Sequence, residues 1–251
     1  MAAMCSLVLG IVLLASWCAL AGEKSSPACS DLREYVYRVR MSDPRADPAS
    51  GPAGFGSGFF LSADGLFMTA LHLFEQAPHA TNVVVEIREG SGRADRPVVE
   101  IVSFSRSLDF VVARVRLGAT RVKVPAAAPS VRPGDRVFGF RIGAPSAKDF
   151  SPLAAIACTR GEVVTVSPQE ISVKGEAFFL PGSSGSPVFD AGGRVVSIAL
   201  EMVNWEPEGP KPDWTYASLP VETARVAPKL RRPLTVADFL STLRREAPAS
   251  R

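Results

Sequence analysis

The sequence has few of the residues that build metal and redox sites. Histidine occurs only twice, as His72 and His79, and the four cysteines include no Cys-x-x-Cys pair. Structural zinc sites need four ligands, usually cysteine and histidine in closely spaced pairs. We therefore expect no metal and no cofactor.

An excess of one charge is also missing. The 28 basic and 25 acidic residues leave a formal net charge of +3 over 251 residues. Nucleic-acid-binding domains carry basic patches. Here the closest basic pairs, Arg231-Arg232 and Arg244-Arg245, fit an ordinary solvated surface, so no nucleic-acid partner is expected. The hydrophobic fraction of 47% predicts a globular protein with a substantial core.

No charged side chain occurs between Met1 and Gly22, and Ser6–Leu20 is almost wholly apolar. Ala19-Leu20-Ala21 has the small-x-small pattern of a signal peptidase site. We expect residues 1–21 to be a signal peptide, which predicts a secreted or periplasmic protein with no membrane contact after cleavage. The alternative is an uncleaved membrane anchor, because about 20 apolar residues can span a bilayer.

Cleavage after Ala21 would leave two cysteines, Cys29 and Cys158. In an oxidising compartment an even pair of cysteines can form a disulfide. Two buried free thiols are the alternative.

Short β-strands dominate the remaining chain, and Leu32–Met41 is predicted to be the first of them. Residues 42–58 are rich in Pro, Gly and Ala, which predicts a loop. Two apolar runs flank Asp64-Gly65 and predict a hairpin, because glycine adopts the positive φ of a tight turn. Further strands are predicted at Val83–Ile87, Val98–Phe104, Phe110–Val115, Val137–Phe140, Gly161–Val166, Ile171–Lys174, Val188–Phe189 and Val195–Leu200. The pattern favours an all-β barrel or sandwich.

Helical periodicity occurs only near the C-terminus. Thr235 and Asp238 resemble a capping box, and the apolar residues that follow share one helical face: Val236, Phe239, Leu240 and Leu243. The Pro-rich segment from Pro125 to Pro133 is the best candidate for a linker between two halves.

A serine nucleophile, a base and an orienting carboxylate are all available. Ser184 lies between Gly182 and Gly185, in a loop whose backbone N–H groups could face a developing oxyanion. His72 directly follows an apolar strand, whereas His79 lies in a polar stretch, so His72 is the candidate base. Asp109 precedes a buried-looking strand, where an unpaired carboxylate is costly. An ordinary turn, a structural histidine and a strand-capping aspartate are the alternatives.

At four blocks the sequence resembles trypsin-like serine peptidases, with the bacterial HtrA/Deg type as the nearest likeness. The blocks are Gly56-Ser57-Gly58-Phe59-Phe60, Thr69-Ala70-Leu71-His72, Leu108-Asp109-Phe110-Val111-Val112 and Gly182-Ser183-Ser184-Gly185-Ser186-Pro187. The resemblance implies an all-β fold of two six-stranded antiparallel β-barrels (chymotrypsin-like) with a C-terminal helix. The implied divisions are residues 22–121 for the barrel with His and Asp, 122–230 for the barrel with Ser, and 231–251 for the helix and tail.

The resemblance also implies roles. Ser184 corresponds to the nucleophile, His72 to the general base and Asp109 to the residue that orients it, with the N–H groups of Gly182 and Ser184 as the oxyanion hole. Phe178 corresponds to the floor of the primary specificity pocket and suggests small or medium apolar substrate residues, unless it packs in the barrel core. Protein or peptide substrates are the expected partners, and the oligomeric state is left open.

The sequence departs from the family at Ser183, where animal digestive members carry Asp, and at Ser186, which replaces a glycine. Only about twenty residues follow Leu230, so regulation through a PDZ domain is not expected. An α/β-hydrolase is excluded because both histidines precede Ser184. The remaining rival is a catalytically silent or latent binding module on the same fold.

Overall fold

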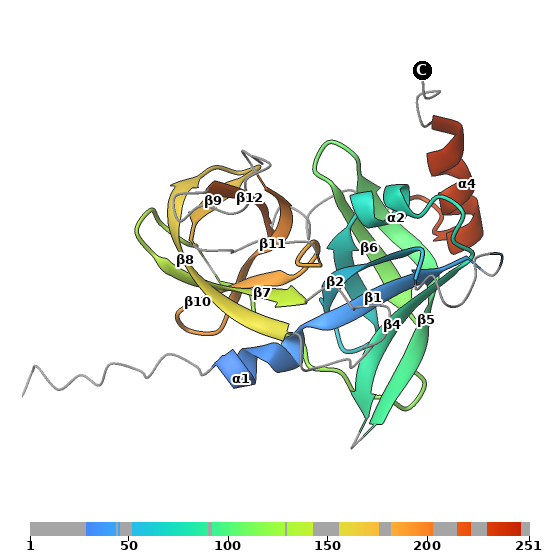
Figure 1. Cartoon of the computed structure of the whole chain (residues 1–251), viewed down its shortest axis with the longest axis horizontal. Helices are drawn as coiled ribbons and strands as arrows, with labels where there is room; N and C mark the ends of the chain where they lie inside the picture. The colour runs from blue at the N-terminus through green and yellow to red at the C-terminus, as the bar shows by residue number, and fades with distance from the viewer. Residues whose placement is uncertain are drawn as a thin grey trace, which may run out of the picture.

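The computed structural model describes residues 29–43, 45, 52–89, 92–128, 130–142, 156–175, 182–202, 215–221 and 230–246. These residues form two closed antiparallel β-barrels of six strands, which lie side by side (Figure 1). The two-barrel fold and the C-terminal helix predicted from the sequence are confirmed. In this part of the chain, no helix has the length and apolar character needed to cross a membrane.

The first barrel has the strand order β5-β4-β1-β2-β3-β6 and is closed by pairing of β6 with β5. Its strands are β1 (Tyr37–Ser42), β2 (Gly54–Phe60), β3 (Leu66–Ala70), β4 (Asn82–Glu89), β5 (Gly92–Ser105) and β6 (Phe110–Val115). A short helix, α2 (His72–Gln76), follows β3.

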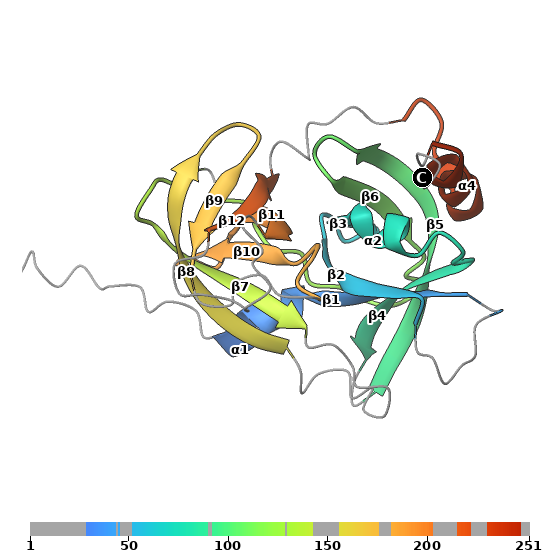
Figure 2. The same ribbon diagram turned by 45° about the horizontal axis from the view of Figure 1, so that its top comes forward.

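The second barrel has the order β10-β11-β12-β9-β8-β7 and closes through β10 and β7. Its strands are β7 (Arg136–Ile142), β8 (Ile156–Val166), β9 (Ile171–Lys174), β10 (Pro187–Asp190), β11 (Val195–Met202) and β12 (Thr215–Pro220). Figure 2, turned by 45°, shows β10 and the loop before it on the side that faces the first barrel.

The predicted hairpin around Asp64-Gly65 is present, with Gly65 at φ +99°. The predicted loop over residues 42–58 is wrong at its end, because β2 already begins at Gly54. Side chains of the barrel interior occupy the space that a Cβ would need at two of its glycines: Leu73 fills it at Gly56 and Phe67 fills it at Gly58. The glycines therefore belong to a strand that has to accommodate large neighbours, not to a flexible loop.

The predicted first strand, Leu32–Met41, is wrong over its first residues. Residues Cys29–Leu32 form helix α1 and Arg33–Tyr35 form the 3-10 helix η2, before β1 begins at Tyr37. Leu32 and Val36 are both buried in the same apolar cluster. Val36, at φ −103° and ψ 121°, has the extended backbone that leads into β1.

An apolar cluster joins the two barrels. The first barrel contributes Phe59, Met68, Val102, Phe110 and Val112, and the second contributes Phe138, Phe140, Phe189, Val195, Ile198 and Leu219. Helix α1 lies against the same cluster through Leu32. Its first residue, Cys29, is joined by a disulfide to Cys158 on β8, across a sequence separation of 129 residues.

The C-terminal segment returns to the first barrel. Strand β13 (Leu234–Thr235) pairs with β5, and helix α4 (Val236–Glu246) packs its apolar face into the core of that barrel. The predicted cap is confirmed, because the Asp238 N–H donates to Thr235 Oγ1 at 3.1 Å. Phe239 makes edge contacts with Phe74 on α2 and Phe104 on β5, so α4 supports the helix that begins at His72.

Replacing Cys158 by Ser should lower the stability of the chain. Opening a long disulfide loop increases the entropy of the unfolded state and typically costs about 2–5 kcal/mol. We expect the midpoint of thermal unfolding to fall by roughly 5–15 °C. Addition of a reductant should lower the midpoint of the parent by a similar amount and leave that of the variant unchanged. A variant as stable as the oxidised parent would contradict this account.

Candidate active site

His72 stands where β3 passes into α2. The Leu71 N–H donates to the Asp109 carbonyl at 3.1 Å, which ties this bend to the turn before β6. Leu73 and Phe74 are buried in the core of the first barrel. They fix the orientation of the short helix and leave the His72 side chain, 25% exposed, at its start.

Asp109 ends the turn between β5 and β6. It has φ +50° and is the one non-glycine residue with positive φ in the described part of the chain. Such a conformation is costly and often occurs at functional sites. The strained residue turns both carboxylate oxygens toward His72: Oδ1 accepts from the backbone N–H at 2.8 Å, and Oδ2 lies 2.6 Å from Nδ1.

The two contacts of Asp109 with His72 fix the orientation of the imidazole ring. In the tautomer with the proton on Nδ1, this N–H donates a hydrogen bond to Asp109 Oδ2, and the lone pair of the neutral ring is on Nε2. A group held in this way can accept a proton at Nε2 and remain next to the carboxylate that stabilises the resulting cation.

The loop containing Ser184 is folded by two glycines with positive φ, Gly182 at +93° and Gly185 at +86°. The Gly185 N–H donates to the Ala199 carbonyl at 2.7 Å, which attaches the loop to β11. Ser186, a departure from the family pattern, is buried, and its hydroxyl donates to the Phe140 carbonyl at 3.1 Å. A serine therefore fits here because a neighbouring carbonyl satisfies its hydroxyl.

Ser57 on β2 connects the two barrels at this point. Its N–H donates to the Ser184 carbonyl at 2.9 Å, and its hydroxyl donates to the Gly182 carbonyl at 2.7 Å. The Thr69 hydroxyl on β3 in turn donates to the Ser57 carbonyl at 2.6 Å. The sequence places Ser57 in a recognisable Gly-Ser-Gly block, but sequence reasoning assigned it no role. A polar residue between two glycines in a strand was the available signal.

The structure brings Ser184 to the same end of β3 as His72. A Cβ on Gly185 would lie 2.1 Å from the Ser57 carbonyl oxygen and 3.0 Å from the Ala70 nitrogen, two residues before His72. The hydrogen bonds of the described residues join His72 to Asp109 but do not include one between Ser184 and His72. Such bonds are often long in the absence of substrate and shorten when it binds.

Gly182 and Ser184 supply two backbone donors in the Ser184 loop. Within the described residues, no backbone carbonyl accepts a hydrogen bond from the N–H of Gly182 or of Ser184. Phe178, the expected floor of a specificity pocket, lies outside the described residues.

The family model of the trypsin-like peptidase domain matches residues 56–198, which is more than half of the chain. The chain belongs to this family. The matched trypsin-like domain includes His72, Asp109 and Ser184. A solved structure titled "Crystal structure of Deg5" has the same fold, with a TM-score of 0.57 and 16% identity over 78% of this chain and 90% of that chain.

Curated relatives carry protease names. Two proteins named "Probable periplasmic serine endoprotease DegP-like" are similar to the chain. The one from Marinomonas sp. is 24% identical over 185 residues, 72% of this chain and 38% of the relative. The one from Pseudomonas fulva is 26% identical over 174 residues, 68% of this chain and 34% of the relative. The chain thus spans about a third of the length of these relatives.

Replacing Gly185 by Ala should weaken the packing of the Ser184 loop against β2 and β3. The methyl group would collide with the Ser57 carbonyl oxygen on β2 and lie 3.0 Å from the Ala70 nitrogen on β3. Gly134→Ala is the matched control, because Gly134 has φ +90° and a Cβ there would have open space around it. The left-handed backbone costs both variants about 1–2 kcal/mol. We expect Gly185→Ala to lose at least twice as much unfolding free energy in a denaturant titration, and equal losses would contradict the clash.

Proposed function

We propose that this chain is an exported serine endopeptidase that hydrolyses peptide bonds through His72, Asp109 and Ser184. The observation that carries the proposal is the His72–Asp109 pair at 2.6 Å, at the edge of the barrel against which the Ser184 loop is held by Ser57. Each member of the triad belongs to a segment with its own backbone ties, so the arrangement does not depend on flexible side chains alone.

In the first step, Ser184 Oγ attacks the carbonyl carbon of the substrate and passes its proton to His72 Nε2. Asp109 Oδ2 accepts a hydrogen bond from Nδ1–H and stabilises the imidazolium without itself becoming protonated. The carbonyl oxygen becomes negative at this stage, and the N–H groups of Gly182 and Ser184 are the donors proposed to bind it. Loss of one such donor typically costs about 100- to 1,000-fold in rate.

The tetrahedral species then collapses. The C–N bond breaks, His72 returns the proton to the leaving amine, and an acyl-enzyme on Ser184 remains. Water, deprotonated by His72, attacks the ester carbon and releases the acid, while Ser184 regains its proton. Bond making and proton transfer balance without any other group.

The compartment proposed for this reaction is the periplasm or the exterior of the cell. The Cys29–Cys158 disulfide fits an oxidising compartment. The DegP-like relatives have "periplasmic" in their names. Removal of residues 1–21 as a signal peptide remains part of the proposal, and retention of this segment as an anchor is its alternative.

The substrates proposed are peptides or unfolded regions of proteins. Phe178 corresponds to the floor of the primary pocket in the family. The proposed substrates therefore have a small or medium apolar residue before the cleaved bond. A panel of peptides that differ only at this residue measures the preference directly.

A fluorophosphonate probe, which reacts only with an activated serine, tests the proposal. The parent chain should be labelled, and Ser184→Ala and His72→Ala should not. His79→Ala is the matched control because His79, the other histidine, is exposed, and it should be labelled at the parental rate. A folded parent that resists the probe would leave the binding module as the better hypothesis.

Asp109→Asn separates orientation from proton transfer. The amide presents its NH2 group to His72 and favours the wrong tautomer, with the proton on Nε2. We expect kcat for a peptide substrate to fall by about 10⁴-fold, with KM nearly unchanged. Asp238→Asn, which alters an exposed helix cap, should leave kcat unchanged. A loss of less than tenfold in Asp109→Asn would mean that another group orients His72.

A further inference from the structure

Arg38 is a buried cation on the outer face of the first barrel. Its neighbours along β1, Tyr37 and Val39, point into the barrel core, so Arg38 points outward. Only 5% of the residue is exposed all the same. An arginine is almost never buried to this extent unless it is paired or has a function.

The pairing of Arg38 is incomplete. Its Nη1 lies 3.8 Å from Glu86 Oε2, while its Nε and Nη1 have no hydrogen-bond partner among the described residues. Arg40 and Arg93 both approach Glu86 more closely, at 3.2 Å, and both also pair with Asp95. The group contains three cations and two anions, so one positive charge is not balanced within it.

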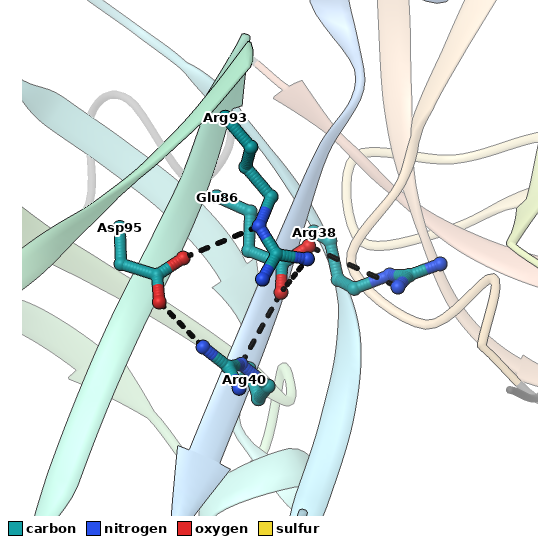
Figure 3. Close-up of polar contacts among 5 residues, drawn as sticks. All are labelled: Arg38, Arg40, Glu86, Arg93 and Asp95. Atoms are coloured by element: carbon teal, nitrogen blue, oxygen red, sulfur yellow. Dashed lines mark hydrogen bonds and ion pairs between the residues drawn. The ribbon is translucent and has the colours of Figure 1, made fainter. Parts of the chain in front are cut away.

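Figure 3 shows this arrangement: Arg40 and Arg93 gather around the two carboxylates, whereas the guanidinium of Arg38 extends away from them. Burial lowers the pKa of Arg38, and the nearby cations Arg93 and Arg40 act in the same direction against Glu86. Of the three arginines, Arg38 has the longest ion pair with Glu86, at 3.8 Å.

The strand register places this charge beside the candidate active site. Ser57, Arg38, Glu86 and Asp95 are consecutive cross-strand partners on β2, β1, β4 and β5. Directly opposed residues have their Cβ atoms about 5 Å apart on the same face. Arg38 is thus the immediate neighbour of Ser57, whose hydroxyl donates to the Gly182 carbonyl.

The Gly182 carbonyl has a position that matters for catalysis. Its peptide group, which joins Gly182 to Ser183, lies between the two peptide groups whose N–H form the proposed oxyanion hole. Holding this carbonyl toward β2 consequently restricts the orientation of both donors. The oxygen accepts one hydrogen bond from Ser57 and retains a second lone pair.

We propose that Arg38 is a positioning residue for the oxyanion hole, whose buried guanidinium attracts the Gly182 carbonyl and holds the Ser184 loop in its productive shape. This inference rests on the proposed function and extends it to a residue on the opposite barrel. Glu86, the cross-strand partner of Arg38, lies 3.8 Å from Arg38 Nη1 and keeps the side chain beside Ser57. A charge within a low-dielectric interface acts more strongly on a carbonyl dipole than one in water.

Arg38→Met tests the proposal, because methionine keeps much of the side-chain length and removes the charge. We expect kcat for a peptide substrate to fall about tenfold with KM within a factor of two, since the loop affects the transition state more than substrate binding. Arg38→Lys keeps the charge and should recover most of kcat. Arg40→Met is the matched control: it removes a charge from the same network, but its partner on β2 is Phe55, and its kcat should be parental.

Hydrogen exchange of the loop gives a readout that needs no activity. The Gly185 N–H donates to the Ala199 carbonyl on β11, and the Ser186 N–H donates to the Ser183 carbonyl. They should exchange faster in Arg38→Met than in the parent and in Arg40→Met, while the midpoints of thermal unfolding of the two variants stay similar. Unchanged exchange, or equal losses of kcat in Arg38→Met and Arg40→Met, would overturn the inference. A parent that the fluorophosphonate probe does not label contradicts the proposed function instead, and the exchange data still decide the role of Arg38.

Discussion

The contact between the outer face of β2 and the loop containing Ser184 holds the candidate active site together. Each barrel is closed by pairing of its own strands. His72 and Asp109 belong to one barrel and Ser184 to the other. A misplacement of about 1 Å can cost 100-fold in rate. The two hydrogen bonds of Ser57, 2.9 and 2.7 Å long, and the close contact of Gly185 with β2 and β3 hold the Ser184 loop at a fixed distance from the first barrel.

The surroundings of this contact combine apolar packing with a few polar groups. Aromatic and aliphatic side chains of both barrels exclude water from the interface. Within it, the hydroxyls of Ser57 and Ser186 donate to carbonyls of the second barrel, at Gly182 and Phe140. A buried donor without a partner costs about 1–3 kcal/mol. The hydrogen bond from Ser57 therefore selects one relative position of the barrels, which apolar packing alone would specify less sharply, whereas the bond from Ser186 lies within the second barrel.

The two ends of the described chain reinforce the pair of barrels. Helix α1 precedes the first barrel in sequence but packs at the junction and is tied to the second barrel through Cys29. Helix α4 follows the second barrel but packs on the first, where Phe239 touches Phe74. Helix α1 is thus linked to the second barrel and α4 to the first, where α4 supports the short helix that starts with His72.

Local signals in the sequence were sufficient for several features. Asp64-Gly65 predicted the hairpin, Thr235 and Asp238 predicted the start of α4, and the blocks around His72, Asp109 and Ser184 predicted the two-barrel fold. These features depend on neighbouring residues or on a family pattern, so a linear sequence contains them. The strand at Gly54–Phe60, the helix at Cys29–Leu32, the pairing of Cys29 with Cys158 and the row from Ser57 to Asp95 were decided by the tertiary structure. Each of them depends on side chains that lie far away in the sequence, such as Leu73 against Gly56, and only folding brings these side chains into contact.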